Sequence, residues 1–217
     1  MDIWPLRARA VILDLDGVLA DSDAAVEGAW REWADRCGLE PSDVLPYVWG
    51  TRTEDVMRRL APHRDATAET MWLEHRESQY TVAACPGAVE FVRALAPARW
   101  GIVTSGWRDT AMSRLEKIGI PIPNMLITAS DTVRGKPDPE PYLAASRALG
   151  TTAGDCVVIE DSAAGVRAAR ASGAWTIGIS GAPLAGVDVD ARVNSLCELR
   201  VEVDAGGVTL SPRKLLR

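Results

Sequence analysis

The hydrophobic pattern of the chain alternates between short apolar runs and longer amphipathic segments. The apolar runs are typical of buried strands and lie at residues 10–15, 100–104, 124–128, 156–159 and 174–179. Single helical segments follow most of these runs, and they cover residues 87–96, 107–118, 139–149 and 163–172. Because single helices between strands require crossover connections, the pattern predicts an α/β fold with a parallel sheet.

Residues 21–84 interrupt this alternation, because they contain helical patterns only. The expected helices span 21–37, with Asp21 or Ser22 as the N-cap, and then 53–60 and 66–80. We therefore predict a helical domain at 21–84, inserted into a sheet domain that is formed by residues 1–20 and 85–217.

Turn-forming residues divide the segments further. Pro41, Pro46 and Pro62 are expected to break the segments between these helices. The tail from Val201 to Arg217 contains a Gly-Gly turn and a basic end, so it is expected to form a strand pair or to be partly loose.

Composition and charge exclude several classes of protein. The 217 residues are 47% hydrophobic and 25% charged, and the net charge of −6 argues against a general nucleic-acid binder. No apolar run approaches the ~18–20 residues of a membrane span, and Met1–Arg9 lacks the apolar stretch of a secretory signal. The four cysteines form no Cys-x-x-Cys pair, which favours free thiols. We expect a cytoplasmic monomer or weak dimer, with no nucleic-acid or membrane partner.

The first apolar run ends on two carboxylates and a glycine. Asp14 and Asp16 are two positions apart, so an extended backbone directs both side chains to the same side. Their mutual repulsion needs a proton or a cation, and Mg²⁺ prefers such oxygen ligands. Gly17 permits a sharp turn directly after the pair. The same residues also fit a strand that ends in an ordinary Asx-type turn.

Polar residues follow the other strands as well. Thr104 and Ser105 follow the second run, Lys136 lies in the loop after the third, and Glu160 and Asp161 follow the fourth. Each group alone also fits a helix cap, a solvated loop lysine or a polar turn. Since the carboxyl ends of parallel strands meet at one edge, the combination favours one site for phosphoryl transfer.

The carboxylates suit covalent catalysis on a phosphate monoester. Mg²⁺ bound by Asp14, Asp161 and a main-chain oxygen near Asp16 would offset the charge of the substrate. Asp14 would then attack phosphorus and become an aspartyl phosphate. Asp16 would protonate the leaving alkoxide and later deprotonate the attacking water.

The remaining residues suit the binding of phosphoryl oxygens. The Thr104 hydroxyl and the Ser105 amide are expected to hold these oxygens, and Lys136 to offset charge on the nucleophile and on the transferring group. Glu160 is expected to lie one layer further from the metal and to orient metal-bound water.

The chain resembles the haloacid dehalogenase-like hydrolase superfamily in four segments. They are Asp14-Leu15-Asp16-Gly17-Val18, Val103-Thr104-Ser105-Gly106, Gly135-Lys136-Pro137-Asp138-Pro139-Glu140-Pro141-Tyr142 and Glu160-Asp161-Ser162-Ala163-Ala164-Gly165-Val166. The resemblance implies a Rossmann-like core with an inserted α-helical cap domain, Mg²⁺ as cofactor, and a phosphatase of subfamily IA that acts on small sugar or polyol phosphates. Dehalogenases of the superfamily lack the second aspartate, which is present here as Asp16.

The inserted segment carries the features that would select the substrate. Arg52 stands where similar polyol-phosphate phosphatases have arginine, so it is expected at the ester or the leaving group; pairing with Glu54 or Asp55 is the alternative. Trp49 is expected either to line the pocket or to pack between cap helices.

Two other functions stay open. Related mutases that isomerise β-glucose 1-phosphate carry a cap histidine where this chain has Val26, which disfavours a phosphomutase. A non-catalytic protein that binds a phosphorylated metabolite is also conceivable, although no residue type that the chemistry requires is missing.

Overall fold

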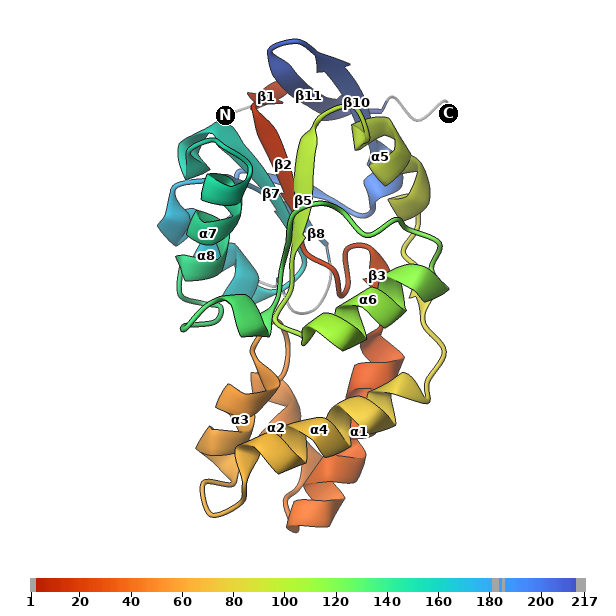
Figure 1. Cartoon of the computed structure of the whole chain (residues 1–217), viewed down its shortest axis with the longest axis vertical. Coiled ribbons are helices and arrows are strands. Elements are labelled where there is room, and N and C mark those ends of the chain that lie inside the picture. The colour runs from red at the N-terminus through yellow and green to blue at the C-terminus, as the bar shows by residue number, and fades with distance from the viewer. Residues whose placement is uncertain (1–2, 181–183, 185, 214–217) are drawn as a thin grey trace.

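A parallel sheet of six strands forms the centre of the molecule (Figure 1). The computed structural model describes residues 3–180, 184 and 186–213. The strand order is β6 (Leu126–Ile127), β5 (Arg99–Val103), β2 (Ala10–Leu13), β7 (Cys156–Glu160), β8 (Trp175–Ile179) and β9 (Ala191–Val193). All neighbouring pairs are parallel, which confirms the predicted α/β class.

Helices cover both faces of this sheet. They are α5 (Ala88–Leu95) and α6 (Arg108–Lys117) on one face, and α7 (Glu140–Ala148) and α8 (Ala163–Ser172) on the other. Strand β2 is apolar throughout because helices cover both of its faces. Val11 and Leu13 pack into the core beneath α5 and α6, whereas Ile12 packs beneath α7 and α8. A strand that is buried on both faces is therefore a continuous apolar run, without the alternation of apolar and polar residues seen when one face is exposed.

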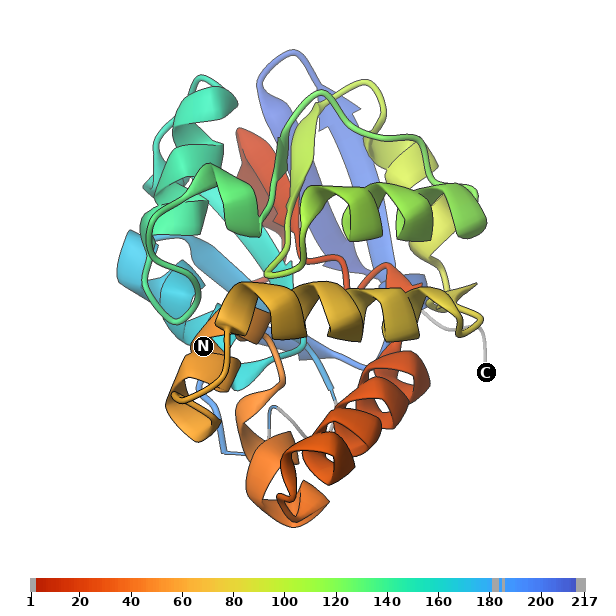
Figure 2. The same ribbon diagram turned by 60° about the horizontal axis from the view of Figure 1, so that its bottom comes forward.

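The helical insertion, which we define as residues 21–84, lies beyond the carboxyl ends of the central strands (Figures 1 and 2). Its elements are α1 (Asp23–Cys37), α2 (Pro41–Val44), the 3-10 helix η1 (Leu45–Tyr47), α3 (Thr53–Leu60) and α4 (Ala66–Ser78). Trp30, Trp33, Met57 and Leu73 belong to a hydrophobic core of its own. The insertion therefore has separate packing, held between strands β3 (Ala20–Asp21) and β4 (Ala83–Ala84).

Pro41 and Pro46 lie between α1 and α3, and Pro62 lies between α3 and α4, as expected. Pro41 is the first residue of α2, and Pro46 lies within η1. Proline is compatible with the first turn of a helix, because the amide it lacks would have no helical partner there. The sequence did not predict the short helical turns α2 and η1 that the segment between α1 and α3 forms.

An antiparallel sheet covers one end of the core. It consists of β1 (Leu6–Ala8), β11 (Gly207–Pro212) and β10 (Leu199–Asp204). The strand pair that was one of two expectations for the tail is present, whereas the basic end at 214–217 lies outside the described residues. The four cysteines are free. Among the described helices, none is long and apolar enough to cross a membrane.

Candidate active site

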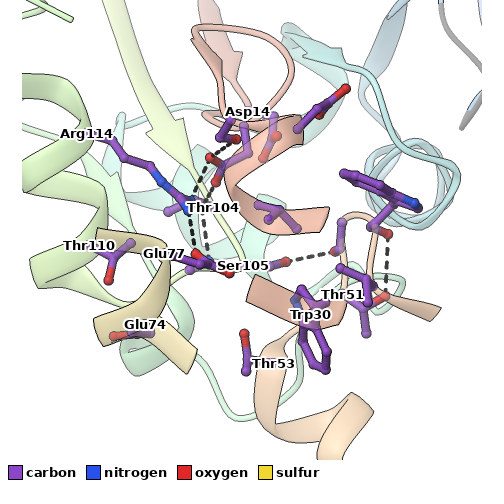
Figure 3. Close-up of a pocket in the computed structure, with 18 of the residues that line it drawn as sticks. Asp14, Trp30, Thr51, Thr53, Glu74, Glu77, Thr104, Ser105, Thr110 and Arg114 are labelled. Carbon is purple, nitrogen blue, oxygen red and sulfur yellow. Dashed lines mark hydrogen bonds and ion pairs between the residues drawn. The ribbon is translucent and has the colours of Figure 1, made fainter. Parts of the chain in front are cut away.

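The four predicted segments meet beyond the carboxyl ends of the central strands. Asp14 follows β2, Thr104 follows β5, and Asp161 follows β7. Lys136 reaches the same place from the long loop after β6. Figure 3 shows Asp14, Thr104 and Ser105 close together at a pocket that the helical insertion closes from the other side.

Lys136 is the buried cation of this site. Its side chain is 1% exposed, and its Nζ lies 2.5 Å from Asp14 Oδ1 and 2.6 Å from Glu160 Oε1. Burial opposes the charge of the ammonium, but the two carboxylates outweigh this effect and raise the pKa of Lys136. The lysine therefore stays protonated beside Asp14.

One cation does not balance the acidic groups around it. Oxygens of Asp14, Glu160 and Asp161 lie within 4.8 Å of one another. Burial is the largest of the effects that together raise the pKa of Asp14 to about 8; Lys136 opposes it, and the charges of Glu160 and Asp16 act in the same direction as burial. Burial likewise raises the pKa of Asp161 well above its usual range. Such an oxygen-only set with excess negative charge fits a divalent cation such as Mg²⁺.

The turn after β2 is shaped to admit Asp161. Gly17 has a φ of +79°, and a Cβ at this position would lie 1.9 Å from Asp161 Oδ2. No side chain larger than hydrogen fits there without displacing the carboxylate. Gly17 therefore lets Asp161 lie directly against the loop that carries Asp14 and Asp16.

Glu160 was expected to orient metal-bound water, but its hydrogen bonds are with donors of the protein. Its Oε1 accepts hydrogen bonds from Lys136 Nζ at 2.6 Å and from the Tyr142 hydroxyl at 2.6 Å. Its Oε2 accepts from the amides of Asp161 and Ser162, both at 3.1 Å, and from the Ser162 hydroxyl at 3.0 Å. Both oxygens are occupied by protein donors, so Glu160 fixes Lys136 and the start of the loop after β7.

Asp16 is held from two sides. Its Oδ1 accepts hydrogen bonds from the Ser22 hydroxyl at 2.6 Å and from Arg114 Nη1 at 2.7 Å. Thr104 Oγ1 lies 3.5 Å from the other oxygen, Oδ2. Ser22 precedes helix α1 but makes no side-chain cap there, because its hydroxyl is used by Asp16. This use explains why the expected cap of the first helix is not formed.

Ser105 connects the sheet domain to the helical insertion. Its hydroxyl donates a hydrogen bond to the main-chain oxygen of Gly50 at 2.8 Å. Thr104 Oγ1 accepts a hydrogen bond from the amide of Gly106 at 3.0 Å, which orients the threonine. The Ser105 hydroxyl thus holds the loop after β5 against the insertion.

Arg52 does not line the pocket in this structure. Its guanidinium donates to the main-chain oxygens of Val133 at 3.0 Å and of Thr132 at 2.9 Å, and also contacts the Thr132 hydroxyl. Arg58, not Arg52, pairs with Glu54 and Asp55. The contacts match neither expected role, and they assign Arg52 to the junction between the insertion and the loop that carries Lys136.

The pocket wall opposite Asp14 comes mainly from the insertion. Trp49 is one of the residues that line it. Val26 lines it as well. The polar residues of this wall are Asp23, Thr51, Thr53, Glu74 and Glu77 from the insertion and Thr110 from α6. Hydroxyl and carboxylate groups therefore face the space in which a leaving group would lie.

Sequence reasoning missed three buried residues of the site, namely Arg114, Glu77 and Tyr142. Tyr142 lies six positions after Lys136 within a segment that the resemblance already included, so its position carried a signal. Arg114 and Glu77 stand in the last turns of α6 and α4, where charged residues are common on solvated faces. Only the packing of the two helices brings them together.

Comparison with known proteins agrees with this geometry. A family model described as haloacid dehalogenase-like hydrolase matches residues 8–173. The chain is 38% identical to hexitol phosphatase A of Escherichia coli over 182 residues, which cover 81% of this chain and 84% of that protein. It is 33% identical to glycerol-1-phosphate phosphohydrolase 2 of Saccharomyces cerevisiae over 192 residues, covering 81% and 76%.

A solved structure supports the same assignment. A hydrolase from Pseudomonas syringae superimposes with a TM-score of 0.77 at 26% identity, covering 88% of this chain and 94% of that chain. The chain belongs to the haloacid dehalogenase-like hydrolases.

Proposed function

We propose that the protein is a Mg²⁺-dependent phosphatase that hydrolyses a small sugar or polyol phosphate monoester. The observation that carries the proposal is the 2.5 Å contact between Lys136 Nζ and Asp14 Oδ1, next to the carboxylate of Asp161. A buried lysine that contacts two carboxylates, with a third close by, suits a nucleophile that must receive a dianionic group. The names of the relatives from Escherichia coli and Saccharomyces cerevisiae support the same class of substrate.

Five residues have separate roles in the proposed reaction. Asp14 attacks phosphorus and forms an aspartyl phosphate, while Lys136 stabilises charge on both groups. Asp16 donates a proton to the leaving oxygen and later takes one from the water that hydrolyses the intermediate. The Thr104 hydroxyl and the Ser105 amide bind phosphoryl oxygens.

Asp14, Asp161 and the main chain at Asp16 would hold Mg²⁺, which supplies positive charge against the phosphoryl oxygens. The fit rests on the surplus of buried carboxylates, since Lys136 alone offsets a single charge. Gly17 leaves the space that Asp161 needs to approach the other ligands.

Residues 21–84 act as a cap domain over a core of residues 1–20 and 85–217. The pocket wall that the insertion supplies contains hydroxyls and carboxylates, among them Thr51, Thr53 and Glu74. Hydroxyl groups can donate hydrogen bonds to the hydroxyls of a polyol or accept them, and carboxylates can accept them. Trp49 adds an apolar surface beside them, of the kind on which carbon–hydrogen groups of a sugar pack.

A mutase reaction has less support. Val26 lines the pocket at the position where mutases of the resembling branch carry a histidine, and valine neither donates nor accepts a proton. Transfer to another hydroxyl also requires that water be kept away from the intermediate. Hydrolysis needs only the Asp16 carboxyl and a water molecule.

A panel of phosphate esters tests the proposal. Purified protein with Mg²⁺ is assayed for phosphate release from glycerol 1-phosphate, sorbitol 6-phosphate, glucose 6-phosphate and p-nitrophenyl phosphate. Asp14→Asn, which keeps the size of the nucleophile, should lower the rate by at least ~10³-fold, whereas the exposed Asp43→Asn should leave it unchanged. Isomerised sugar phosphate without phosphate release would favour the mutase, and tight binding without turnover a non-catalytic role.

A further inference from the structure

Arg114 connects the sheet domain to the helical insertion through two buried ion pairs. Its side chain is 7% exposed, and its Nη1 lies 2.7 Å from Asp16 Oδ1. Its Nη2 lies 2.5 Å from Oε2 of Glu77, which stands on α4 and is 9% exposed. Figure 3 shows the Arg114 guanidinium directed to Glu77 on one side and to the acidic residues after β2 on the other.

The contact with Arg114 restricts the orientation of Asp16. Two donors, the Ser22 hydroxyl and the Arg114 guanidinium, bind the same oxygen of the carboxyl group, Oδ1. Two hydrogen bonds to one oxygen fix both the side-chain rotamer and the plane of the carboxyl group. The other oxygen, Oδ2, is then the one on the side of Thr104 and the pocket.

Glu77 restricts Arg114 in turn. A long side chain has many rotamers, and a guanidinium bound only at one end keeps some of that freedom. The planar fork of arginine binds two carboxylates at once without losing its orientation. Because Glu77 belongs to the insertion and Arg114 to the sheet domain, both contacts exist together only while α4 rests in its present place.

We propose that Arg114 is a positioning residue that orients Asp16 for proton transfer to the leaving group, and that Glu77 fixes Arg114 from the insertion. The inference rests on the proposed phosphatase function. In the assisted step a bond forms between Asp14 and phosphorus while the ester P–O bond breaks. The departing oxygen keeps the electron pair of that bond and takes the proton of Asp16, so the products are an aspartyl phosphate, an alcohol and the Asp16 carboxylate.

Two esters that differ in their need for a proton separate this role from a structural one. An alkoxide leaving group needs protonation by Asp16, whereas p-nitrophenolate is stable enough to depart without it. The value of kcat/KM reports the steps up to formation of the phosphoenzyme and excludes its later hydrolysis. For Arg114→Met we expect a loss of about 10²-fold in kcat/KM with the fastest alkyl ester of the panel. With p-nitrophenyl phosphate the loss should stay below about 5-fold.

Two further variants keep the test informative if Arg114→Met does not fold. Arg114→Lys keeps the charge but reaches one carboxylate at a time, and Glu77→Met removes the anchor on the insertion. Each should lower the ratio of alkyl to aryl kcat/KM by about 10-fold. The matched control is Glu32→Met, which breaks the ion pair with Arg76 between α1 and α4, outside the pocket, and should leave the ratio unchanged.

The outcomes are distinct. Equal losses for both esters would mean that Arg114 only stabilises the fold, and unchanged values in the folded variants would mean that Asp16 needs no such support. Either result overturns the inference. If wild-type protein hydrolyses neither ester, the proposed function itself fails, which the wild-type assay reveals before any variant is compared.

Discussion

Arg52 donates a 2.9 Å hydrogen bond to the main-chain oxygen of Thr132, across the junction between the helical insertion and the sheet domain. The same side chain packs against Gly135, where a Cβ would lie 2.6 Å from Arg52 Nε. Gly135 directly precedes Lys136, so the insertion contacts the loop that delivers the lysine to Asp14. The position of Lys136 is therefore linked to the placement of the insertion.

Replacing Arg52 by glutamine should loosen this loop. We expect faster amide hydrogen exchange at residues 132–136 and a loss of about 3- to 10-fold in kcat, because Lys136 is held less firmly beside Asp14. The matched control is Arg58→Gln, which breaks pairs with Glu54 and Asp55 on the same helix and should change neither quantity. A rise in KM without faster exchange at 132–136 would instead indicate that Arg52 contacts the substrate.

Glu160→Gln should lower the free energy of unfolding by about 3 kcal/mol. The substitution leaves Lys136 with one anionic partner in a fully buried position, and such a loss is costly. Tyr142→Phe removes a single hydrogen bond to the same oxygen and should cost about 1 kcal/mol. Urea unfolding of both variants gives the comparison. If the two variants lose similar free energies of unfolding, the charge of Glu160 is not needed to balance Lys136.

The central strands were predictable from sequence because they are buried on both faces. All five positions of Cys156–Glu160 are buried, and the four residues before Glu160 are apolar, as expected of a strand that is covered on both faces. Strands β1 and β9 were missed, since each has three residues with an exposed arginine in the middle, Arg7 or Arg192. Hydrogen bonds from a neighbouring strand, not their own pattern, make these segments extended.

In the site too, residues placed by the ends of strands were predictable from sequence, whereas contacts between distant segments were not. Asp14, Lys136 and Asp161 could be predicted to meet because each follows a strand, and parallel strands end at one edge. The partners of Arg52 could not, since Glu54 and Asp55 are its neighbours in sequence while Thr132 is 80 positions away. Pairing between helix faces, as for Arg114 and Glu77, depends on how the insertion packs, which no local pattern encodes.

Mg²⁺ should stabilise the folded protein through the carboxylates around Asp14. At a concentration of about 100 times Kd, binding adds about 2.7 kcal/mol, which corresponds to a rise of about 5–10 °C in Tm. Chelation with EDTA should reverse the shift and abolish phosphate release. Differential scanning fluorimetry measures the shift in wild-type protein, in Asp161→Asn and in the exposed control Asp43→Asn. An undiminished shift in Asp161→Asn would remove Asp161 from the set of ligands.

Glu77 should make stability depend on pH. The pKa of Glu77 is raised from 4.5 to about 7, mainly by burial; Arg114 lowers it, and the charges of Asp16 and Glu74 add to the effect of burial. The folded state binds the proton of Glu77 more tightly than the unfolded state does. The resulting contribution to the free energy of unfolding is therefore fully present below pH 4.5. It is lost as pH rises through about 7.

Glu77→Gln provides the comparison, because it removes the titrating group while every other titration is shared with the wild type. Between pH 4.5 and 8 the stability of the wild type relative to Glu77→Gln should fall by up to about 3 kcal/mol, the equivalent of the shift in pKa. Urea unfolding of both proteins over this range measures the difference. If the difference stays constant or rises with pH, the carboxyl is ionised throughout, and Arg114 then outweighs the burial of Glu77.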